Sequence, residues 1–334
     1  MVPGTKLADP VENKVVLITG GTGSFGSAMV RHLLAHHRPK TIRIFSRDEL
    51  KQFHMRNQLQ DDRLRFFIGD VRDKDRVRRA CEGVDIMIHA AALKQVQACE
   101  YNPFEAIKTN IIGSVNLVDA AIDCGVKKAV ALSTDKAVSP VNLYGATKLC
   151  AEKVFIHGNS YTGQRGTKLA CCRYGNVIGS RGSVIPLFLK QRAEGRLTIT
   201  DRRMTRFWIT LDQAVRFVIQ GLRTMVGGEI FVPQLPSMRI VDLARAMAPK
   251  AELVEIGIRP GEKIHETLIM EEEVRTTYRH KDFFIILPEW FSTEVKRSYP
   301  KKKLPEDFVY NSGQGEHWVS EADLHAMIRE EPWK

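Results

Sequence analysis

The segment KVVLITGGTGSFG, from Lys14 to Gly26, decides the fold of this chain. Its first half is a short β-branched apolar run, which is typical of a buried strand. A helical pattern follows, with Phe25, Met29 and Leu33 on one face. The glycines between the two permit a sharp turn and close packing of helix on strand. The segment therefore predicts a strand, a tight turn and a helix.

The same alternation of apolar runs and helical segments continues along the chain. Four further runs predict buried strands: TIRIFS (41–46), RLRFFIGD (63–70), VDIMIHAAA (84–92) and KAVALSTD (128–135). Near-continuous apolar strands separated by helices indicate a parallel sheet that is covered on both faces. We therefore predict an α/β fold with a Rossmann-like, doubly wound parallel sheet.

The composition is that of an ordinary globular protein, with 43% hydrophobic and 27% charged residues. No window approaches the roughly 18 apolar residues of a membrane helix, and the N-terminal segment lacks the apolar core of a secretory signal. We therefore expect a cytoplasmic protein with no membrane partner. The 6 cysteines show neither a CxxC pair nor metal-ligand spacing, so we expect buried free thiols and no metal site.

The net charge of +11, from 50 Lys and Arg against 39 Asp and Glu, bears on the partners. Such an excess is compatible with nucleic acid, an anionic membrane surface or small phosphorylated ligands. No aromatic platform, recognition-helix motif or zinc knuckle supports nucleic acid. Small anionic ligands are therefore the favoured partners.

The rhythm of strands and helices changes after about Asn176, where glycines and prolines break the chain into short elements. This pattern predicts a smaller, irregular α+β substrate-binding domain. We place the dinucleotide-binding domain at residues 13–178, with later segments returning to it, and the substrate-binding region mainly at 179–334. Residues 1–12 are expected to form a disordered extension.

The turn from Gly20 to Gly26 satisfies two related glycine patterns. Gly21, Gly23 and Gly26 match GxGxxG, and Gly20, Gly23 and Gly26 match GxxGxxG. Here the motif occupies the strand–turn–helix context that dinucleotide binding requires, because free N–H groups of the helix N-terminus can bind a pyrophosphate. We expect contacts to the dinucleotide from Gly20, Thr22, Gly23, Ser24, Phe25, Gly26 and, at the end of the fourth strand, Ala90.

The end of the second predicted strand bears on the choice between NAD and NADP. An acidic residue there binds the ribose 2′-hydroxyl of NAD, whereas an arginine accommodates the 2′-phosphate of NADP. Ser46 and Arg47 favour NADP, with Lys51 as a possible second cation. Asp48 leaves NAD open and can also cap the next helix. The adenine is expected beside Asp70–Val71.

A candidate catalytic group follows the fifth predicted strand, where STDK (133–136) precedes YGATK (144–148). Tyr144 and Lys148 are spaced i, i+4 and share one helix face. Lys148 can therefore bind the nicotinamide ribose, and we expect its charge to lower the phenol pKa of Tyr144 from about 10. Tyr144 would then serve as the base for a substrate hydroxyl.

With these motifs in place, the chain resembles the extended short-chain dehydrogenase/reductase family that modifies nucleotide sugars. Within it, the chain is similar to the configuration-inverting UDP-N-acetylglucosamine 4,6-dehydratases of bacterial pseudaminic acid synthesis. The likeness runs from about Asn13 over nearly the whole chain. It is carried by FSRDELKQ, HAAALKQV, STDKAVSPVNLYGATK, RYGNVIGSRGSVIP, RRMTRFWITLDQAV, GGEIFVPQLPSMRIVDLA and GIRPGEKIHE.

The pair Asp135-Lys136 is the most specific feature of this resemblance, because retaining 4,6-dehydratases carry Asp-Glu at the same place. The resemblance implies that Asp135 is the acid for the departing C6 hydroxyl and that Lys136 is the base for the C5 proton. Lys136 must be neutral to act, so we expect burial or a neighbouring charge such as Lys148 to lower its pKa. Thr134 is expected to bind the C4 oxygen.

Further contacts are also implied by the resemblance. Lys94, which follows the fourth strand, is expected to contact the substrate. Asn176, Val177, Gly179, Ser180 and Arg181 match the surroundings of the nicotinamide and diphosphate, with Asn176 on the substrate. Arg206 and Arg259 resemble arginines that bind the UDP diphosphate, and Glu262 a carboxylate that binds the uridine ribose.

The sequence thus predicts a lyase that dehydrates UDP-N-acetylglucosamine, with NADP, to UDP-2-acetamido-2,6-dideoxy-β-L-arabino-hexos-4-ulose. A nucleotide-sugar 4-epimerase is the alternative enzyme, although it has no evident use for Asp135 with Lys136. A non-catalytic NADP-binding sensor is the third hypothesis, and the presence of both Tyr144 and Lys148 argues against it. The resemblance further implies a homo-oligomer, a dimer or a hexamer.

Overall fold

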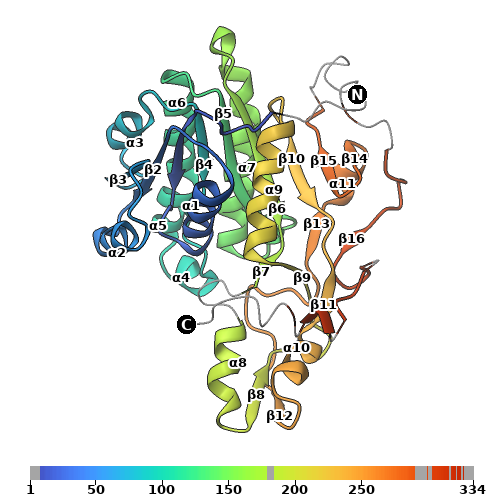
Figure 1. Cartoon of the computed structure of the whole chain (residues 1–334). Helices are drawn as coiled ribbons and strands as arrows, with labels where there is room; N and C mark the ends of the chain where they lie inside the picture. Colours follow the sequence, from blue (N-terminus) through green and yellow to red (C-terminus); the bar gives the residue numbers. More distant parts are fainter. Residues whose placement is uncertain are drawn as a thin grey trace.

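A nine-stranded sheet forms the centre of the computed structural model, which describes residues 8–178, 184–289, 299, 303–315, 317–320, 322–324 and 326. Its order is β14-β15-β10-β6-β5-β4-β1-β2-β3 (Figure 1). The strands from β3 to β10 are parallel, and β15 and β14 add an antiparallel edge. The strands are β1 (Val15–Thr19), β2 (Thr41–Ser46), β3 (Leu64–Ile68), β4 (Ile86–His89), β5 (Lys128–Thr134), β6 (Lys168–Tyr174), β10 (Ile230–Pro233), β14 (Thr277–Arg279) and β15 (Phe283–Ile286).

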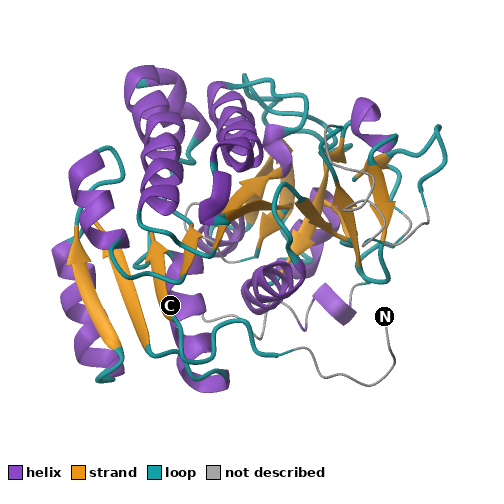
Figure 2. Ribbon diagram, turned by 90° about the horizontal axis from the view of Figure 1, so that it is seen from above, coloured by secondary structure: helices purple, strands orange, loops and turns teal. Residues whose placement is uncertain are grey.

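Helices cover both faces of this sheet (Figure 2). On one face, α6 packs against both α3 and α7, and on the other α1 packs against α9. The doubly wound α/β fold is therefore confirmed, and the five strands predicted from apolar runs are β1 to β5. The helices are α1 (Ser24–His36), α2 (Glu49–Leu59), α3 (Lys74–Cys81), α4 (Val96–Tyr101), α5 (Pro103–Ile107), α6 (Gly113–Asp123), α7 (Leu143–Gly158) and α9 (Leu211–Thr224).

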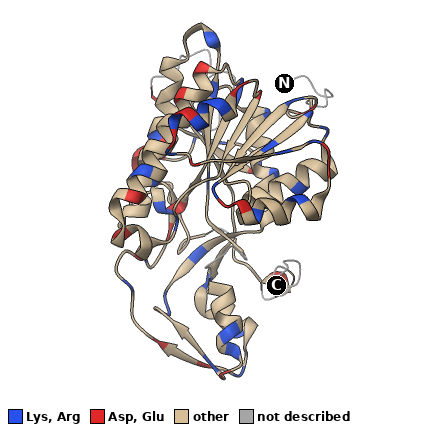
Figure 3. Cartoon of the chain, turned by 90° about the vertical axis from the view of Figure 1, so that its left-hand side faces the viewer, with Lys and Arg blue, Asp and Glu red and all other residues tan. Residues whose placement is uncertain are grey.

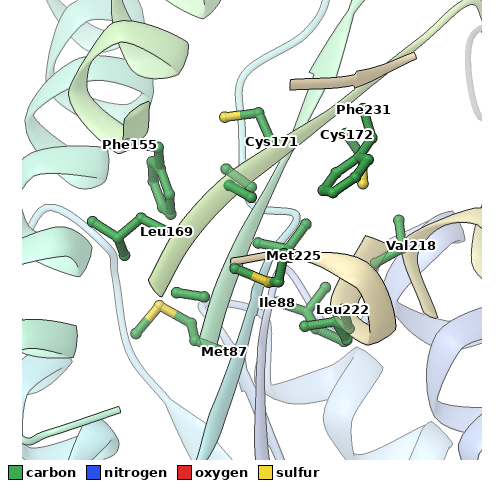
Figure 4. Packing of buried hydrophobic residues seen from close by; sticks show 14 of the residues in the cluster. Met87, Ile88, Phe155, Leu169, Cys171, Cys172, Val218, Leu222, Met225 and Phe231 are labelled. Atoms are coloured by element: carbon green, nitrogen blue, oxygen red, sulfur yellow. The ribbon is translucent and has the colours of Figure 1, made fainter. Parts of the chain in front are cut away.

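The core of the sheet is apolar on both sides. In Figure 4, Phe155 of α7 lies on one side of strands β4 to β6, and Val218 and Leu222 of α9 lie on the other. Cys171 and Cys172 alternate between the two sides and are free thiols. Burial of such side chains stabilises the fold by about 1.5–3 kcal/mol each, which explains why the strands read as continuous apolar runs.

A short π-helical segment (Lys108–Ile112) joins α5 to α6. It turns Asn110 inward, where the side chain accepts from Leu93 N at 2.8 Å and donates to Leu93 O at 2.9 Å. Asn110 also donates to Thr147 Oγ1 of α7 at 3.0 Å. The π-helical turn therefore ties the loop after β4 to the helix that carries Tyr144.

A smaller lobe with its own core lies below the carboxyl ends of the main strands (Figure 1). Trp208, Phe188 and Leu243 are buried in it. Three small sheets belong to this half of the chain: β7-β9-β11, β8-β12 and β13-β16. The elements are β7 (Asn176–Val177), α8 (Val184–Arg192), β8 (Arg196–Ile199), β9 (Thr205–Ile209), β11 (Ser237–Arg239), α10 (Ile240–Met247), β12 (Glu252–Glu255), β13 (Thr267–Ile269), α11 (Glu271–Val274) and β16 (Tyr310–Asn311).

The N-terminal extension predicted at residues 1–12 is ordered at its end. Val11 is fully buried, and Asp9 Oδ2 lies 2.8 Å from His37 Nδ1 at the end of α1. The prediction of disorder is therefore wrong for these residues, because one buried apolar side chain and one side-chain hydrogen bond anchor them. Residues 1–7 lie outside the described part of the chain.

Charged residues gather on the helices and loops. Figure 3 shows basic and acidic residues interspersed there, while the strands of the sheet are mostly uncharged. Among the described residues, no helix is both long and apolar enough to cross a membrane.

Candidate active site

A cleft of about 1060 Å³ opens at the carboxyl ends of the parallel strands, between the main sheet and the smaller lobe. Ligands of open α/β sheets bind at this edge, where strand order reverses. Here β1 has β2 on one side and β4 on the other. The sequence-predicted residues in the wall are Gly20, Gly23, Ser24, Phe25, Gly26, Ala90, Lys94, Thr134, Lys136, Tyr144, Lys148, Asn176, Val177, Arg206, Arg259 and Glu262.

Other predicted residues do not form this wall. Thr22 and Asp135 are buried, and Ser46, Arg47, Asp48, Lys51, Asp70 and Val71 lie at or beyond the ends of β2 and β3. Gly179, Ser180 and Arg181 lie outside the described residues.

The glycine-rich turn has the shape that a dinucleotide needs. Gly20 has a φ of +65° and packs so closely on the loop after β4 that a Cβ there would lie 2.8 Å from Ala91 N. A Cβ on Gly26 would collide with the Gly20 carbonyl. Helix α1 begins at Ser24 with Gly23 as its N-cap and without a capping side chain. Its first N–H groups can therefore bind an anion.

The predicted adenosine end is organised around two carboxylates. Asp48 caps α2 by accepting from Lys51 N at 2.9 Å, and the Lys51 ammonium also pairs with it. Asp70 is held by Arg72 at 2.6 Å, and Arg47 is 3.7 Å from the same carboxylate. The Arg47 side chain is 56% exposed. Lys51 is thus committed to Asp48, whereas Arg47 can reorient toward a phosphate.

Lys136 is the centre of the proposed catalytic group. Strand β5 ends at Thr134, and a 3₁₀ turn (Asp135–Ala137) follows. Lys136 Nζ lies 3.0 Å from Asp135 Oδ1, 3.1 Å from Asn176 Oδ1 and 3.5 Å from Glu266 Oε1. The Thr134 hydroxyl donates to Asp135 Oδ1 at 2.9 Å. The two residues predicted from the sequence are therefore in contact, with Lys136 in the wall of the cleft and Asp135 buried beside it.

The protonation of Lys136 differs from the sequence prediction. Burial favours the neutral amine, but the negative charges of Asp135 and Glu266 together outweigh it and raise the Lys136 pKa. The expectation of a lowered pKa is therefore wrong for this arrangement. The charges that affect the Lys136 pKa most are those of Asp135, Glu266 and Arg206, rather than the expected Lys148.

Tyr144 also differs. Burial raises the pKa of Tyr144 to about 12, against the opposing effects of Lys136 and of a hydrogen bond with Thr134. Lys148 Nζ instead donates to Leu132 O at 2.7 Å, and burial lowers the Lys148 pKa. The prediction of a lowered Tyr144 pKa is therefore wrong, and the main cation that opposes the effect of burial is Lys136 rather than Lys148.

The predicted diphosphate contacts lie on the wall formed by β9 and the segment before β13. Arg206 is buried, donates to Ile264 O at 3.0 Å and lies 3.8 Å from Glu266 Oε1. Arg259 is 3.9 Å from Glu262 Oε1, and its side chain is 45% exposed. Both arginines can therefore face an anionic ligand in the cleft.

Several residues of the site were missed by the sequence reasoning. A Cβ on Gly145 would collide with the Lys136 carbonyl, so this glycine lets α7 approach the 3₁₀ turn. Glu266 and Lys263 reach the cleft from a segment far along the chain, and Lys263 Nζ donates to Val138 O at 2.5 Å. Gly145 belongs to the YGATK motif, and Lys263 and Glu266 belong to GIRPGEKIHE. Both motifs were recognised, but the sequence does not show which of their residues contact Lys136.

A Rossmann sheet whose glycine-rich turn shares one cleft with a strand-end Ser-Thr and a Tyr-x-x-x-Lys pair defines the class, the extended short-chain dehydrogenase/reductases. The chain belongs to the polysaccharide biosynthesis protein family, whose sequence profile matches residues 16–288.

Curated relatives with two different enzyme names resemble the chain. The UDP-N-acetylglucosamine 4,6-dehydratase (inverting) of Campylobacter jejuni subsp. jejuni serotype O:23/36 (strain 81-176) is 48% identical over 94% of this chain and 97% of its own length. A UDP-glucose 4-epimerase of Rickettsia conorii is 45% identical over 82% of this chain and 83% of its own. Dehydratase and epimerase names thus both occur among the relatives.

Solved structures agree with the fold. Pen from Bacillus thuringiensis has a TM-score of 0.89 and 38% identity, covering 97% of this chain and 99% of its own. DesIV, a dTDP-glucose 4,6-dehydratase from Streptomyces venezuelae solved with NAD and TYD bound, has a TM-score of 0.67 and 25% identity, covering 75% and 86%. The likeness supports a nicotinamide dinucleotide as the cofactor type.

Proposed function

We propose that this chain is an NADP-dependent hydro-lyase that converts UDP-N-acetylglucosamine into its 4-keto-6-deoxy derivative with inversion at C5. The contact of 3.0 Å between Lys136 and Asp135 beside Tyr144 carries the proposal, because dehydration needs both an acid and a second base. The C. jejuni relative, 48% identical, supports the same reaction.

The residues of the glycine-rich turn fit the proposed cofactor. Gly20 and Gly26 leave no room for a side chain, and the N-terminus of α1 offers N–H groups for the pyrophosphate. When bound, the nicotinamide would accept a hydride from C4 of the sugar and return it to C6, so that it is unchanged overall.

Arg47 supports the choice of NADP over NAD. Its guanidinium is exposed, and Asp48, the acidic rival at this strand end, is already occupied by the α2 cap and Lys51. We therefore expect Arg47→Ala to weaken NADP binding about tenfold while NAD binding changes little. Fluorescence titration of both nucleotides measures this; an equal loss for both would exclude Arg47 as the 2′-phosphate ligand.

Tyr144 would begin the reaction by taking the proton of the C4 hydroxyl. Burial raises the pKa of its phenol to about 12, and Thr134 and Lys136 oppose that effect, so that the phenolate is reached through these two contacts. The resulting C4 ketone acidifies the C5 proton, so that the next group required is a base next to C5.

Asp135 and Lys136 would then remove water across C5 and C6. The ion pair carries one proton that both groups can hold, and its transfer over 3.0 Å from Nζ to Oδ1 gives a neutral amine and a carboxylic acid. The amine takes the C5 proton, the C5–C6 double bond forms, and the acid protonates the leaving C6 hydroxyl, which departs as water. With the hydride that a bound cofactor would supply to C6, a solvent-derived proton added to C5 on the opposite face would give the ketone inverted at C5.

The UDP group would bind on the wall opposite the cofactor. Arg206 and Arg259 supply positive charge for the diphosphate, and Glu262 can accept hydrogen bonds from ribose hydroxyls. Lys94 and Asn176 line the same cleft and are proposed sugar contacts. Asn176 already contacts Lys136, so it can orient both base and sugar.

Product analysis in deuterated water tests this function. NMR of the product from UDP-N-acetylglucosamine should show a C4 ketone, a C6 methyl group, and deuterium at an inverted C5. Lys136→Ala should form the product at least about 10²-fold more slowly. A product that keeps its C6 oxygen with an inverted C4 would instead support the epimerase reading, which the Rickettsia relatives favour.

The biological setting is proposed on separate grounds. All six cysteines are free, which fits the reducing conditions of the cytoplasm. Tyr101 and Phe104 are 87% and 75% exposed on α4 and α5, which supports a homo-oligomer with this face covered. The product would begin the synthesis of a pseudaminic acid-type sugar nucleotide.

A further inference from the structure

Glu266 lies next to the proposed catalytic pair. Its Oε1 is 3.5 Å from Lys136 Nζ and 3.8 Å from Arg206 Nε, and the residue is buried in the wall of the cleft. We propose that Glu266 is a positioning residue, which holds the Lys136 ammonium and sets the pH at which that amine becomes available as a base. The inference rests on the proposed function, in which Lys136 removes the C5 proton.

The backbone at Glu266 is fixed from two sides. Glu266 N donates to Ser312 Oγ at 2.9 Å, and Ser312 N donates to Glu266 O at 2.8 Å. Two residues earlier, Ile264 O accepts from Thr205 N at 3.0 Å and from the Arg206 guanidinium at 3.0 Å. The carboxylate is therefore attached to a segment held between β9 and the β16 side, and its place beside Lys136 is preorganised.

Glu266 is one of two carboxylates next to the Lys136 ammonium. Asp135 comes from the 3₁₀ turn itself, and Glu266 approaches from the segment before β13. Because an amine between two carboxylates is held in its charged form, removal of either carboxylate must favour the neutral amine. The titratable and charged groups that face Lys136 are Asp135, Glu266, Arg206 of β9, Tyr144 of α7 and Lys263.

The second oxygen of Glu266 is also informative. Glu266 Oε2 is buried and has no hydrogen-bond partner among the described residues. Most buried polar side-chain atoms in native folds have a hydrogen-bond partner. One oxygen thus holds the lysine, and the other remains available to a donor group of a ligand in the cleft.

The chemical reactivity of Lys136 tests this role without using the enzymatic reaction. Only the neutral amine is reductively methylated by formaldehyde with a borane reductant, so the rate at fixed pH reports the neutral fraction. Glu266→Gln removes the charge and keeps the shape, and we expect Lys136 to react about 10- to 100-fold faster, as a fall of its pKa by about one to two units requires. Glu266→Asp should restore part of the protection, and peptide mapping by mass spectrometry measures both rates.

Two controls separate this effect from loss of structure. Glu255→Gln removes an exposed carboxylate that pairs with Arg202 at 3.4 Å, and should leave the Lys136 rate unchanged. Lys148 is buried and must stay unmodified in each folded variant. If Lys148 becomes modified in Glu266→Gln, that variant is not folded correctly and Glu266→Asp replaces it. In Glu266→Asp the methylation rate of Lys136 must then rise by a smaller factor.

An unchanged Lys136 rate in the folded Glu266 variant overturns the inference. The pH profile of turnover provides a second readout. The part of the profile in which turnover increases with pH should move to lower pH in Glu266→Gln. The two proposals fail separately: faster methylation combined with an epimerised product would retain the role of Glu266 and reject the dehydration.

Discussion

Two buried charge clusters of the molecule, one around Arg173 and one around Lys136, differ in how completely their hydrogen bonds are formed. In the first, the Arg173 guanidinium of β6 donates to both oxygens of Glu152, to both oxygens of Glu273 and to Leu268 O, at 2.7–3.0 Å. In the second, around Lys136, the oxygens Asp135 Oδ2 and Glu266 Oε2 are buried with no partner among the described residues.

The difference separates a structural cluster from a functional one. A buried polar atom without a partner costs about 1–3 kcal/mol, so a fold retains one only where something else compensates. The Arg173 cluster has its donors occupied and joins α7, β6 and α11. The Lys136 cluster lies at the cleft and contains two carboxylate oxygens without a hydrogen-bond partner among the described residues. Buried charge alone does not identify a site, whereas incomplete pairing beside a cleft does.

The largest expected effect is on stability, at the fully paired cluster. Arg173→Met leaves Glu152 and Glu273 buried together without their cation, and should lower the free energy of unfolding by about 3–5 kcal/mol. Lys136→Met should cost less, about 1–2 kcal/mol, since Arg206 and Lys263 remain near its carboxylates. Urea denaturation of both variants measures the contrast, and equal losses would contradict it.

The next effect is on activity, through the contact between α7 and the 3₁₀ turn. Gly145→Ala places a methyl group against the Lys136 carbonyl and must displace the turn. A shift of about 1 Å costs roughly 10²-fold in rate. Gly125→Ala is the matched control, since nothing lies within 4 Å of its added Cβ. Because Gly125 has a φ of +69°, that control should lose some stability but keep its turnover number. Retained turnover in Gly145→Ala would contradict the positioning role.

The smallest expected effect is the pH dependence of stability, where the two clusters have opposite signs. Against the cost of burial, Arg173 lowers the pKa of Glu273 below its usual 4.5. The stability that this carboxylate contributes is therefore present above pH 4.5 and is lost as the pH falls through its folded pKa. The pKa of Lys136 is raised above 10.5, so its contribution is present below pH 10.5 and is lost as the pH rises.

Variant melting curves measured across pH test these signs. Glu273→Gln should flatten the acid limb of thermal stability and leave the alkaline limb unchanged. Lys136→Met should flatten only the alkaline limb. If one variant flattened both limbs, the two clusters would not be independent.

Much of the fold follows from local sequence, because each parallel strand is a continuous apolar run between helical segments. The places of the glycine-rich turn and of the pair Tyr144 and Lys148 in the cleft also follow from local sequence, because their spacing along the chain sets their geometry. Asp48 as a helix cap belongs to the same kind of local inference.

The charges acting within the site could not be predicted in this way. Glu266 and Arg206 meet Lys136 only because the smaller lobe folds back over the sheet. The charge of Glu266, added to that of Asp135, outweighed both burial and Arg206 and reversed the expected direction of the Lys136 pKa shift. At Tyr144, burial similarly outweighed the charge of Lys136 and raised the pKa of the phenol. The motifs of the site could therefore be recognised from the sequence, whereas the pKa shifts could not, because they depend on charges and burial that only the folded chain brings together.

The π-helical turn at Lys108–Ile112 constrains how this chain can vary in length. A π-turn contains one more residue than the α-turn that would replace it, so it corresponds to a single-residue insertion in a helix. Deleting one residue there would give a more regular helix, but would rotate the preceding residues by about 100° relative to α6. Asn110 would then lose Leu93 and Thr147. The π-helical turn is thus needed to keep Asn110 in contact with Leu93 and Thr147, and a chain shortened by one residue at this turn would lose these contacts.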